Sequence, residues 1–276
     1  MELKLGYHTI CWGGVVGDPV GVTSIKNLFY RSHGDVERAV EEIAELGYDG
    51  FEVFDGNLLD FEGEPNRFAA LLERSGLSLL GVYCGGNFIF PEILGEELWR
   101  LRRAARLAGE MGSRHLVVGG GAQRSGGLGD DDYARLGAAL DQVADIADEN
   151  GLIAVYHPHL TTIAESPDQV EQVLGRSRIA LCADTAHLAA GGGDPVAMIR
   201  QHADRLQYVH LKDLRREPFG FLPLGDGELD MVGIVKTLVE IGYEGWATVE
   251  LDSYDGEPKD AAAASRRFLD AALQSD

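Results

Sequence analysis

The feature that most constrains the fold of this chain is a regular alternation of two kinds of segment. Short apolar segments rich in β-branched and aromatic residues are typical of buried parallel strands. Eight of them occur: Lys4–Ile10, Gly50–Phe54, Ser78–Tyr83, His115–Val118, Ile153–Tyr156, Ile179–Ala183, Leu206–His210 and Trp246–Leu251. Each is followed by an amphipathic segment with helical spacing: Val36–Leu46, Pro65–Ser75, Leu98–Met111, Asp131–Glu149, Pro167–Leu174, Pro195–His202, Met231–Ile241 and Asp260–Leu273. This alternation predicts parallel βαβ units.

Eight such units in a chain of 276 residues predict a closed (β/α)₈ barrel of the α/β class. We expect residues 1–276 to form a single domain. The alternative is an open, doubly wound sheet, which usually carries a Gly-x-Gly-x-x-Gly turn after a strand. Gly119-Gly120-Gly121 follows the fourth predicted strand but lacks the rest of that spacing, so the closed barrel is favoured.

The charge and the cysteines narrow the expected partners and compartment. Asp and Glu number 45 against 24 Lys and Arg, a net charge of −21, whereas nucleic acids and anionic membranes recruit basic residues. No apolar run reaches the roughly 18 residues of a membrane span, and Met1–Leu5 does not resemble a signal peptide. Cys11, Cys84 and Cys182 are too few and too scattered for a disulfide framework. We therefore expect a cytoplasmic protein without a nucleic-acid or membrane partner.

Side chains able to bind metal gather at the ends of the last four predicted strands, and in a barrel these ends meet at one rim. The four segments are Tyr156-His157-Pro158-His159, Asp184-Thr185-Ala186-His187, His210-Leu211-Lys212-Asp213 and Glu250-Leu251-Asp252. Each of these polar residues has an ordinary structural explanation when it is considered alone. A strand-end Asp caps the next helix, a His forms structural hydrogen bonds, and a Glu pairs with a basic residue. Four neighbouring strands with such groups favour one divalent ion, and Mn²⁺, Co²⁺, Zn²⁺ and Mg²⁺ all suit a mixed His–carboxylate shell.

These motifs resemble those of the xylose-isomerase-like TIM barrels, a superfamily that includes sugar epimerases, inosose dehydratases and apurinic-site endonucleases. The resemblance covers nearly the whole chain and is strongest from Tyr156 to Glu250. Asp184–Ala189 and His210–Asp213 are particularly similar to inosose dehydratases, and Gly225–Asp230 resembles the Gly-x-Gly-x-x-Asp turn after the seventh strand. The resemblance implies a metal-dependent enzyme.

The metal ligands implied by the resemblance are Asp184, His210 and Glu250, from the last three strands. The epimerases usually have Glu on the fifth strand, where this chain has His157. We predict His157 as the fourth ligand. His159 lies two residues on, so it points the same way and is the alternative.

The predicted reaction is proton transfer next to a carbonyl of a sugar or cyclitol, through a metal-stabilised enediolate. Glu250 is one candidate base. His157 or His159 is another, because an imidazole has an ordinary pKa of roughly 6.5 and can therefore take up and release a proton near neutral pH. Lys212 is predicted to donate to a substrate hydroxyl or to polarise the carbonyl. The alternative for Lys212 is an ion pair with Asp213 or Asp184.

Four further residues are predicted to bind the substrate, which we expect to lack phosphate because the rim has little positive charge. His187 resembles the substrate-binding His of the family, or it braces the next helix. Trp12, in the long loop Cys11–Asp35, is placed to stack on a sugar or simply anchors that loop. Glu52 binds a hydroxyl or pairs with a basic residue. Arg124 is the candidate for binding an anion.

Four functional classes follow from this interpretation. A sugar isomerase or epimerase is the first expectation, because Tyr7–Trp12 and the loop after it lack the acidic run of inosose dehydratases. A dehydratase of the same superfamily is the main alternative. A barrel that only binds a sugar or a metal is less favoured. A trinuclear endonuclease is disfavoured because Cys84–Asn87 and Gly119–Gly121 supply no His. Superfamily members are often dimers or tetramers, so a homo-oligomer stays open.

Overall fold

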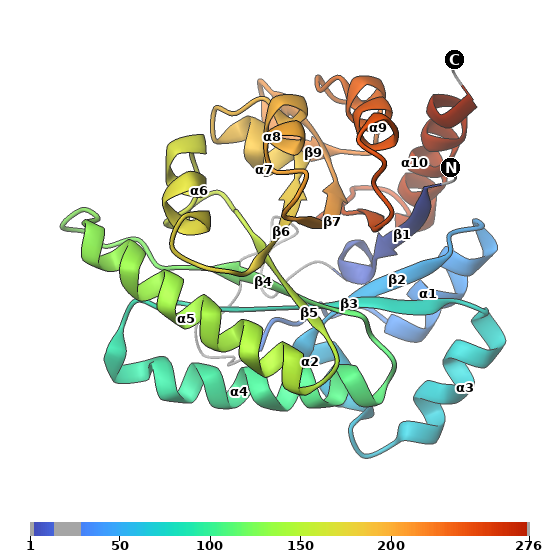
Figure 1. The fold of residues 1–276 in the computed structure, drawn as a ribbon. Coiled ribbons are helices and arrows are strands. Elements are labelled where there is room, and N and C mark those ends of the chain that lie inside the picture. Colours follow the sequence, from blue (N-terminus) through green and yellow to red (C-terminus); the bar gives the residue numbers. More distant parts are fainter. Residues whose placement is uncertain (1–2, 14–28, 275–276) are drawn as a thin grey trace.

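The computed structural model describes residues 3–13 and 29–274, and its eight parallel strands close into a barrel with helices around it (Figure 1). The strand order around the barrel is β1, β10, β7, β6, β5, β4, β3, β2. The barrel strands are β1 (Lys4–His8), β2 (Gly50–Phe54), β3 (Ser78–Gly86), β4 (His115–Gly120), β5 (Ile153–His157), β6 (Ala180–Asp184), β7 (Leu206–Leu211) and β10 (Trp246–Val249). The predicted α/β barrel is confirmed.

The outer layer contains a helix after every barrel strand, as the alternation predicted. These helices are α1 (Val36–Glu45), α3 (Pro65–Ser75), α4 (Pro91–Glu110), α5 (Asp130–Glu149), α6 (Pro167–Leu174), α8 (Pro195–Gln201), α9 (Met231–Glu240) and α10 (Pro258–Gln274). Their ends follow local chemistry: the Asp35 side chain caps α1, and Gly76 ends α3 in the left-handed conformation. Helix α4 begins well before the predicted Leu98.

Several short elements were not predicted. The structure adds η1 (Thr9–Trp12), α2 (Asp55–Leu58), η2 (Leu59–Phe61), α7 (Thr185–Ala190) and an antiparallel hairpin of β8 (Asp213–Arg216) and β9 (Phe219–Leu222). Thr9 and Ile10, expected in the first strand, lie in η1 instead, because the His8 side chain accepts the Ile10 N–H and starts a turn there. The hairpin and α7 both lie next to the carboxyl ends of the strands that carry the predicted site.

Two apolar layers hold the barrel. The larger one packs the outward side chains of the strands against the helices. The smaller one fills the barrel interior with Ile10 of η1 and with strand residues, which are Phe54, Leu80, Tyr83, Val117, Val155, Cys182 and Tyr208. Cys11, Cys84 and Cys182 are free thiols and buried. Among the described helices, none is long and apolar enough to cross a membrane.

Candidate metal centre

Four side chains from neighbouring strands meet at the carboxyl end of the barrel. His157 and Asp184 end β5 and β6, His210 lies in β7, and Glu250 directly follows β10. One potential ligand atom of each lies within 4.8 Å of the others, and all four residues are buried. We name these residues the His–Asp–His–Glu group. The structure thus brings together all four predicted metal ligands.

The atoms that face one another in this group are buried and poorly satisfied. His157 Nε2 and Asp184 Oδ2 are shielded from solvent without making a hydrogen bond, and His210 Nδ1 lies 3.1 Å from Glu250 Oε2. Asp184 Oδ2 lies 3.4 Å from His157 Nε2 and 4.0 Å from His210 Nδ1. Each unpartnered buried polar atom costs about 1–3 kcal/mol. A divalent cation would use all of these lone pairs at once, and two imidazoles with two carboxylates are a suitable donor set for one.

Asp184 has separate uses for its two oxygens. Oδ1 accepts the backbone N–H of His187 at 2.8 Å and so caps α7. Oδ2 makes no hydrogen bond and faces His157. The capping role and the predicted ligand role are therefore compatible, because each needs only one oxygen.

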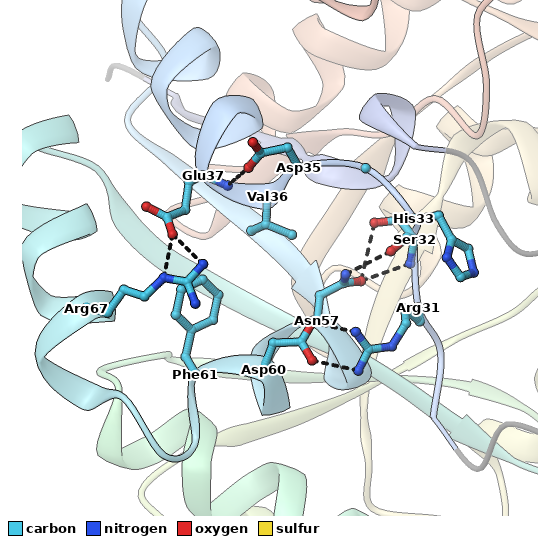
Figure 2. A pocket seen from close by; sticks show the side chains of 11 residues that line it. Arg31, Ser32, His33, Asp35, Val36, Glu37, Asn57, Asp60, Phe61 and Arg67 are labelled. Atoms are coloured by element: carbon cyan, nitrogen blue, oxygen red, sulfur yellow. Dashed lines mark hydrogen bonds and ion pairs between the residues drawn. The ribbon is translucent and has the colours of Figure 1, made fainter.

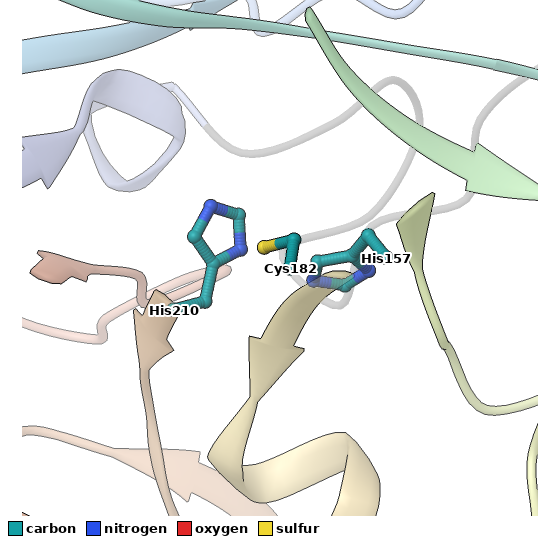
Figure 3. Close-up of side chains that lie close together, drawn as sticks. All are labelled: His157, Cys182 and His210. Carbon is teal, nitrogen blue, oxygen red and sulfur yellow. The ribbon is translucent and has the colours of Figure 1, made fainter. Parts of the chain in front are cut away.

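Cys182 lies beneath the group. It precedes Asp184 by two residues on β6, and Figure 3 shows its thiol between the imidazoles of His157 and His210. The sulfur lies within 4.8 Å of a nitrogen of each imidazole. Burial, with the nearby charge of Glu52, raises the pKa of this thiol well above its usual value. The carboxylates therefore provide the charged donors of the site.

Lys212 is a buried cation at the edge of the group. Its Nζ lies 2.6 Å from Asp252 Oδ1 and 3.2 Å from Glu250 Oε2, rather than pairing with the residues that the sequence offered. It also lies 4.3 Å from the centre of the Phe221 ring. Burial lowers the pKa of Lys212, but Asp252 and Glu250 raise it more, so it stays well above its usual value. Lys212 can donate a hydrogen bond or a charge, but it cannot act as a base near neutral pH.

His159 and His187 stack beside Lys212, with ring centres 3.7 Å apart. Lys212 Nζ contacts His187 Nε2 at 3.4 Å, and His159 Nδ1 contacts the Leu160 carbonyl oxygen at 2.6 Å. An ammonium only donates and a carbonyl only accepts, so His187 carries its proton on Nδ1 and His159 leaves Nε2 free to accept one. Burial and neighbouring imidazoles lower the pKa of both side chains, which keeps them neutral.

Glu52 lies on the far side of His210 and is fully buried. Its Oε2 is 2.9 Å from His210 Nε2, and its Oε1 is 3.7 Å from His8 Nε2. Burial acts to raise the pKa of Glu52, but the His210 imidazole outweighs it and lowers that pKa overall. Of the two alternatives considered from the sequence, Glu52 has paired with buried basic groups, although these are imidazoles rather than Arg or Lys.

Trp12 and Arg124 have partners of their own. Trp12 Nε1 donates to Glu42 Oε2 at 2.5 Å. The Arg124 guanidinium pairs with Asp132 at 2.8 Å and lies 4.7 Å from the Phe90 ring centre. The described contacts do not join either residue to the His–Asp–His–Glu group. Their proposed roles in substrate binding stay predictions, and residues 14–28 of the loop after β1 lie outside the described residues.

A cavity of about 270 Å³ lies elsewhere, between residues 31–37, α2, η2 and α3 (Figure 2). Its charged side chains pair with one another: Arg31 binds Asp60, and Arg67 binds Glu37. Its buried Asn57 is satisfied by Ser32. None of its lining residues belongs to the predicted site, and all the convergent unpartnered donors described above lie at the barrel mouth.

Comparison with known proteins agrees with this geometry. Residues 40–272 match the model of the xylose isomerase-like TIM barrel family. The chain belongs to this family. An inosose dehydratase of Geobacillus kaustophilus is 31% identical over 276 aligned positions, which cover 86% of this chain and 87% of that enzyme. This relative is an enzyme, and the match places the protein within a family of enzymes.

Solved structures of the same fold include two with different chemistry. A probable 3-DHS dehydratase from Bacillus anthracis aligns with a TM-score of 0.76 at 16% identity, covering 97% of this chain and 99% of that one. A 3-keto-D-glucoside 4-epimerase from E. coli aligns with a TM-score of 0.74 at 17% identity, covering 98% of this chain and 100% of that one. At such identities the likeness shows the fold alone, so the reaction must be argued from the site.

Three residues at the site were not among the predicted site residues. Asp252 binds Lys212, Phe221 lies over that ammonium, and His8 faces Glu52. The sequence could have indicated Asp252, because it lies two residues after Glu250 and residues two apart in an extended segment point to the same side. Phe221 belongs to a hairpin that the apolar pattern of the sequence did not predict.

Proposed function

We propose that this protein is a divalent-metal-dependent dehydratase that eliminates water from an unphosphorylated keto-polyol such as an inosose. The observation that carries the proposal is the convergence of buried donor atoms of His157, Asp184, His210 and Glu250 at the barrel mouth. Its relatives support the choice of reaction, because the inosose dehydratase from Geobacillus kaustophilus aligns over most of both chains. The permanent cation Lys212 beside the group supports it too.

The residues divide the work of an elimination between a base and an acid. The His–Asp–His–Glu group would hold a divalent cation, which would supply Lewis-acid chemistry for the negative charge that develops on a carbonyl oxygen. His159 Nε2 takes the proton from the carbon next to that carbonyl, since His159 is neutral and this nitrogen has a free lone pair. The carbon–oxygen bond of the hydroxyl on the next carbon then breaks, and a carbon–carbon double bond forms. Lys212 gives a proton to the departing hydroxide, and water leaves.

His187 is placed to bind the substrate. Its Nε2 faces Lys212, so its Nδ1 carries the proton, and this atom is buried without a partner. An unpartnered N–H beside the proposed acid and base is suited to donate to a substrate oxygen. His187 would thereby orient the polyol so that the departing hydroxyl lies near Lys212.

A sugar isomerase or epimerase is the second candidate. It uses the same proton removal but returns the proton to carbon instead of expelling hydroxide. Glu250 follows β10 and His159 follows β5, so the mouth offers two proton acceptors from separate strands. A carboxylate and an imidazole placed apart in this way suit removal of a proton at one position and its return at another.

Proton exchange in deuterated water distinguishes these reactions. The protein with Mn²⁺ or Co²⁺ would be incubated with a panel of inososes and ketohexoses and followed by NMR and ultraviolet absorbance. A dehydratase gives loss of the α-proton together with the absorbance of a new enone. An epimerase gives deuterium incorporation into a new diastereomer without the enone. Tight binding of a polyol without exchange would instead support the non-catalytic barrel and contradict the proposal.

The metal site has a matched pair of variants. Asp184→Asn keeps the oxygen that caps α7 but removes the charge that faces His157, so we expect a folded protein without stoichiometric metal. Asp194→Asn is the control, because Asp194 caps α8 by accepting the Val196 N–H at 3.0 Å and is exposed. Full metal occupancy in Asp184→Asn, measured by elemental analysis, would reject the assigned ligands.

A further inference from the structure

The contact between Glu52 and His210 determines which nitrogen of His210 carries a proton. Glu52 Oε2 lies 2.9 Å from His210 Nε2. An ionised carboxylate only accepts hydrogen bonds, so Nε2 must be the N–H in this contact. The other nitrogen, Nδ1, faces the carboxylates of the proposed ligands, 3.1 Å from Glu250 Oε2 and 4.0 Å from Asp184 Oδ2. A cation held by those carboxylates would take the Nδ1 lone pair and displace any proton from that nitrogen, while Glu52 retains the proton on Nε2.

His8 presents a second N–H to the same carboxylate. The backbone N–H of Ile10 donates to His8 Nδ1 at 3.0 Å, so the proton of a neutral His8 is on Nε2. That atom lies 3.7 Å from Glu52 Oε1, which is longer than a hydrogen bond but close enough for electrostatic attraction. Glu52 therefore faces an N–H at each of its two oxygens. A carboxylate can accept from both, whereas the amide of Gln would direct its own N–H₂ at one of them.

The contacts of Glu52 argue against a direct role in binding a substrate. Its side chain has 0% exposure, and so have the side chains of His8 and His210. The Tyr208 ring packs against His210 with ring centres 5.6 Å apart, and this further encloses the pair. The Glu52 oxygens are directed at two imidazoles within the barrel rather than at the mouth.

We infer that Glu52 is a positioning residue that holds His210 as the Nε2-protonated tautomer and so directs the Nδ1 lone pair at the metal ion. The inference rests on the proposed metal site and adds a residue to it from β2, across the barrel from the ligands. His8 supports the negative charge of Glu52 from the opposite side. Carboxylates that orient a metal-binding imidazole in this way typically contribute roughly 10- to 100-fold to metal affinity.

Zinc binding measured by titration calorimetry tests the inference without any assay of activity. Glu52→Gln is expected to weaken zinc binding by roughly 10- to 100-fold. The matched control is Asp55→Asn, which also converts a buried carboxylate near the end of β2 to an amide. Asp55 Oδ1 accepts the N–H groups of Tyr30 and Gly56, and Asn keeps that oxygen, so the control is expected to bind zinc like the parent protein.

The tautomer itself can be read by NMR of protein labelled with ¹⁵N-histidine and loaded with zinc. In the parent protein we expect His210 with a proton on Nε2 and zinc on Nδ1, and in Glu52→Gln we expect this signal to change. A residue with a merely structural role would not alter this pattern. If Glu52→Gln does not fold, His8→Asn is the second variant, because an Asn oxygen can still accept the Ile10 N–H while the N–H facing Glu52 is lost. It is expected to weaken zinc binding less.

The outcomes separate the inference from the proposed function. If the parent protein binds no zinc, manganese or cobalt, the metal site fails and the inference fails with it. If the parent protein binds zinc through Nε2 of His210, or if Glu52→Gln binds zinc as tightly as the parent, the metal site stands and the role of Glu52 is overturned. Weaker binding in Glu52→Gln, with zinc on Nδ1 in the parent protein, supports both.

Discussion

Lys212 provides the sharpest test of the mechanism at the scale of a single residue. Lys212→Met removes the ammonium but keeps a side chain of similar length against Phe221. We expect the rate of enone formation to fall by roughly 100-fold or more, because the variant lacks the acid proposed to protonate the departing hydroxide. Metal content should be retained, since Lys212 is not in the His–Asp–His–Glu group. An unchanged rate, with metal bound, would show that Lys212 takes no part in proton transfer.

His115 makes the stability depend on pH. It is buried in β4 with its Nδ1 3.1 Å from the Leu80 carbonyl oxygen, and burial lowers the pKa of His115 to about 4 against that hydrogen bond. In the unfolded chain a His titrates near 6.5, so the unfolded state binds a proton first as the pH falls. The stabilisation is complete above about pH 6.5 and is lost on acidification towards pH 4, by about 3 kcal/mol for this residue.

His115→Asn checks this prediction, because its amide N–H₂ can still donate to Leu80 but does not titrate. Denaturant unfolding of both proteins would be measured from about pH 8 to about pH 4, a range that includes the ordinary pKa of His near 6.5 and the lowered pKa of His115. The parent protein should lose stability faster than the variant below about pH 6.5. Parallel curves would mean that His115 is protonated equally in the folded and unfolded states.

The ligands and the residues that support them differ in how far the sequence could predict them. His157, Asp184, His210 and Glu250 stand at strand ends, and the carboxyl ends of parallel strands share a rim, so their meeting followed from the strand pattern. The contact of Glu52 with His210 joins β2 to β7, which are not neighbours in the barrel. Strand periodicity gives the direction of a side chain but not the partner that it meets across the interior.

At the scale of elements, the turn after the β8–β9 hairpin explains the Gly-x-Gly-x-x-Asp motif. The buried carboxylate of Asp213 accepts the backbone N–H groups of Gly225 at 3.0 Å, Gly227 at 3.1 Å and Leu229 at 3.2 Å. Gly225 has a φ of +88°, which favours glycine. Asp230 ends the motif by capping α9. This turn anchors the hairpin whose Phe221 lies over Lys212.

Gly227→Ala is expected to disrupt this anchor. A Cβ at position 227 would lie 2.2 Å from Asp213 Oδ1, so the buried carboxylate must move. We expect a loss of about 1–3 kcal/mol in the free energy of unfolding. Gly95→Ala is the control: it lies in α4, its Cβ would meet no neighbouring atom within 4 Å, and it should stabilise the helix by about 0.5–1 kcal/mol. Equal effects of the two substitutions in denaturant unfolding would contradict the role of Asp213.

The elements that were predicted and those that were missed differ in the signal they carry. The barrel strands are continuous apolar runs and the main helices have a sustained apolar stripe, so both were predicted from periodicity. The hairpin Asp213–Leu222 is short and rich in charge, and α2 has only 4 residues, so neither has a period to detect. The first turns of α4 were missed because Gly95 and several acidic residues weaken the pattern there.

At the scale of the whole molecule, the candidate metal centre spans four consecutive strands of the barrel. β5, β6, β7 and β10 each contribute one ligand, so a bound cation must be released before these strands separate. The chain carries a net charge of −21, and its field favours a cation over an anion at such a site. Metal binding should therefore stabilise the folded molecule as a unit.

Thermal unfolding with and without divalent metal tests this expectation. A cation present at 100 times its dissociation constant should stabilise the protein by about 2.7 kcal/mol, which corresponds to a rise in Tm of about 5–10 °C for a chain of this size. The rise should disappear in Asp184→Asn, whose buried cluster has one charge fewer, and should persist in Asp194→Asn, which leaves the ligands intact. An equal rise in all three proteins would place the stabilising metal elsewhere. No rise with manganese, cobalt or zinc would leave the unpartnered donors at the barrel mouth without the ion that we assign to them.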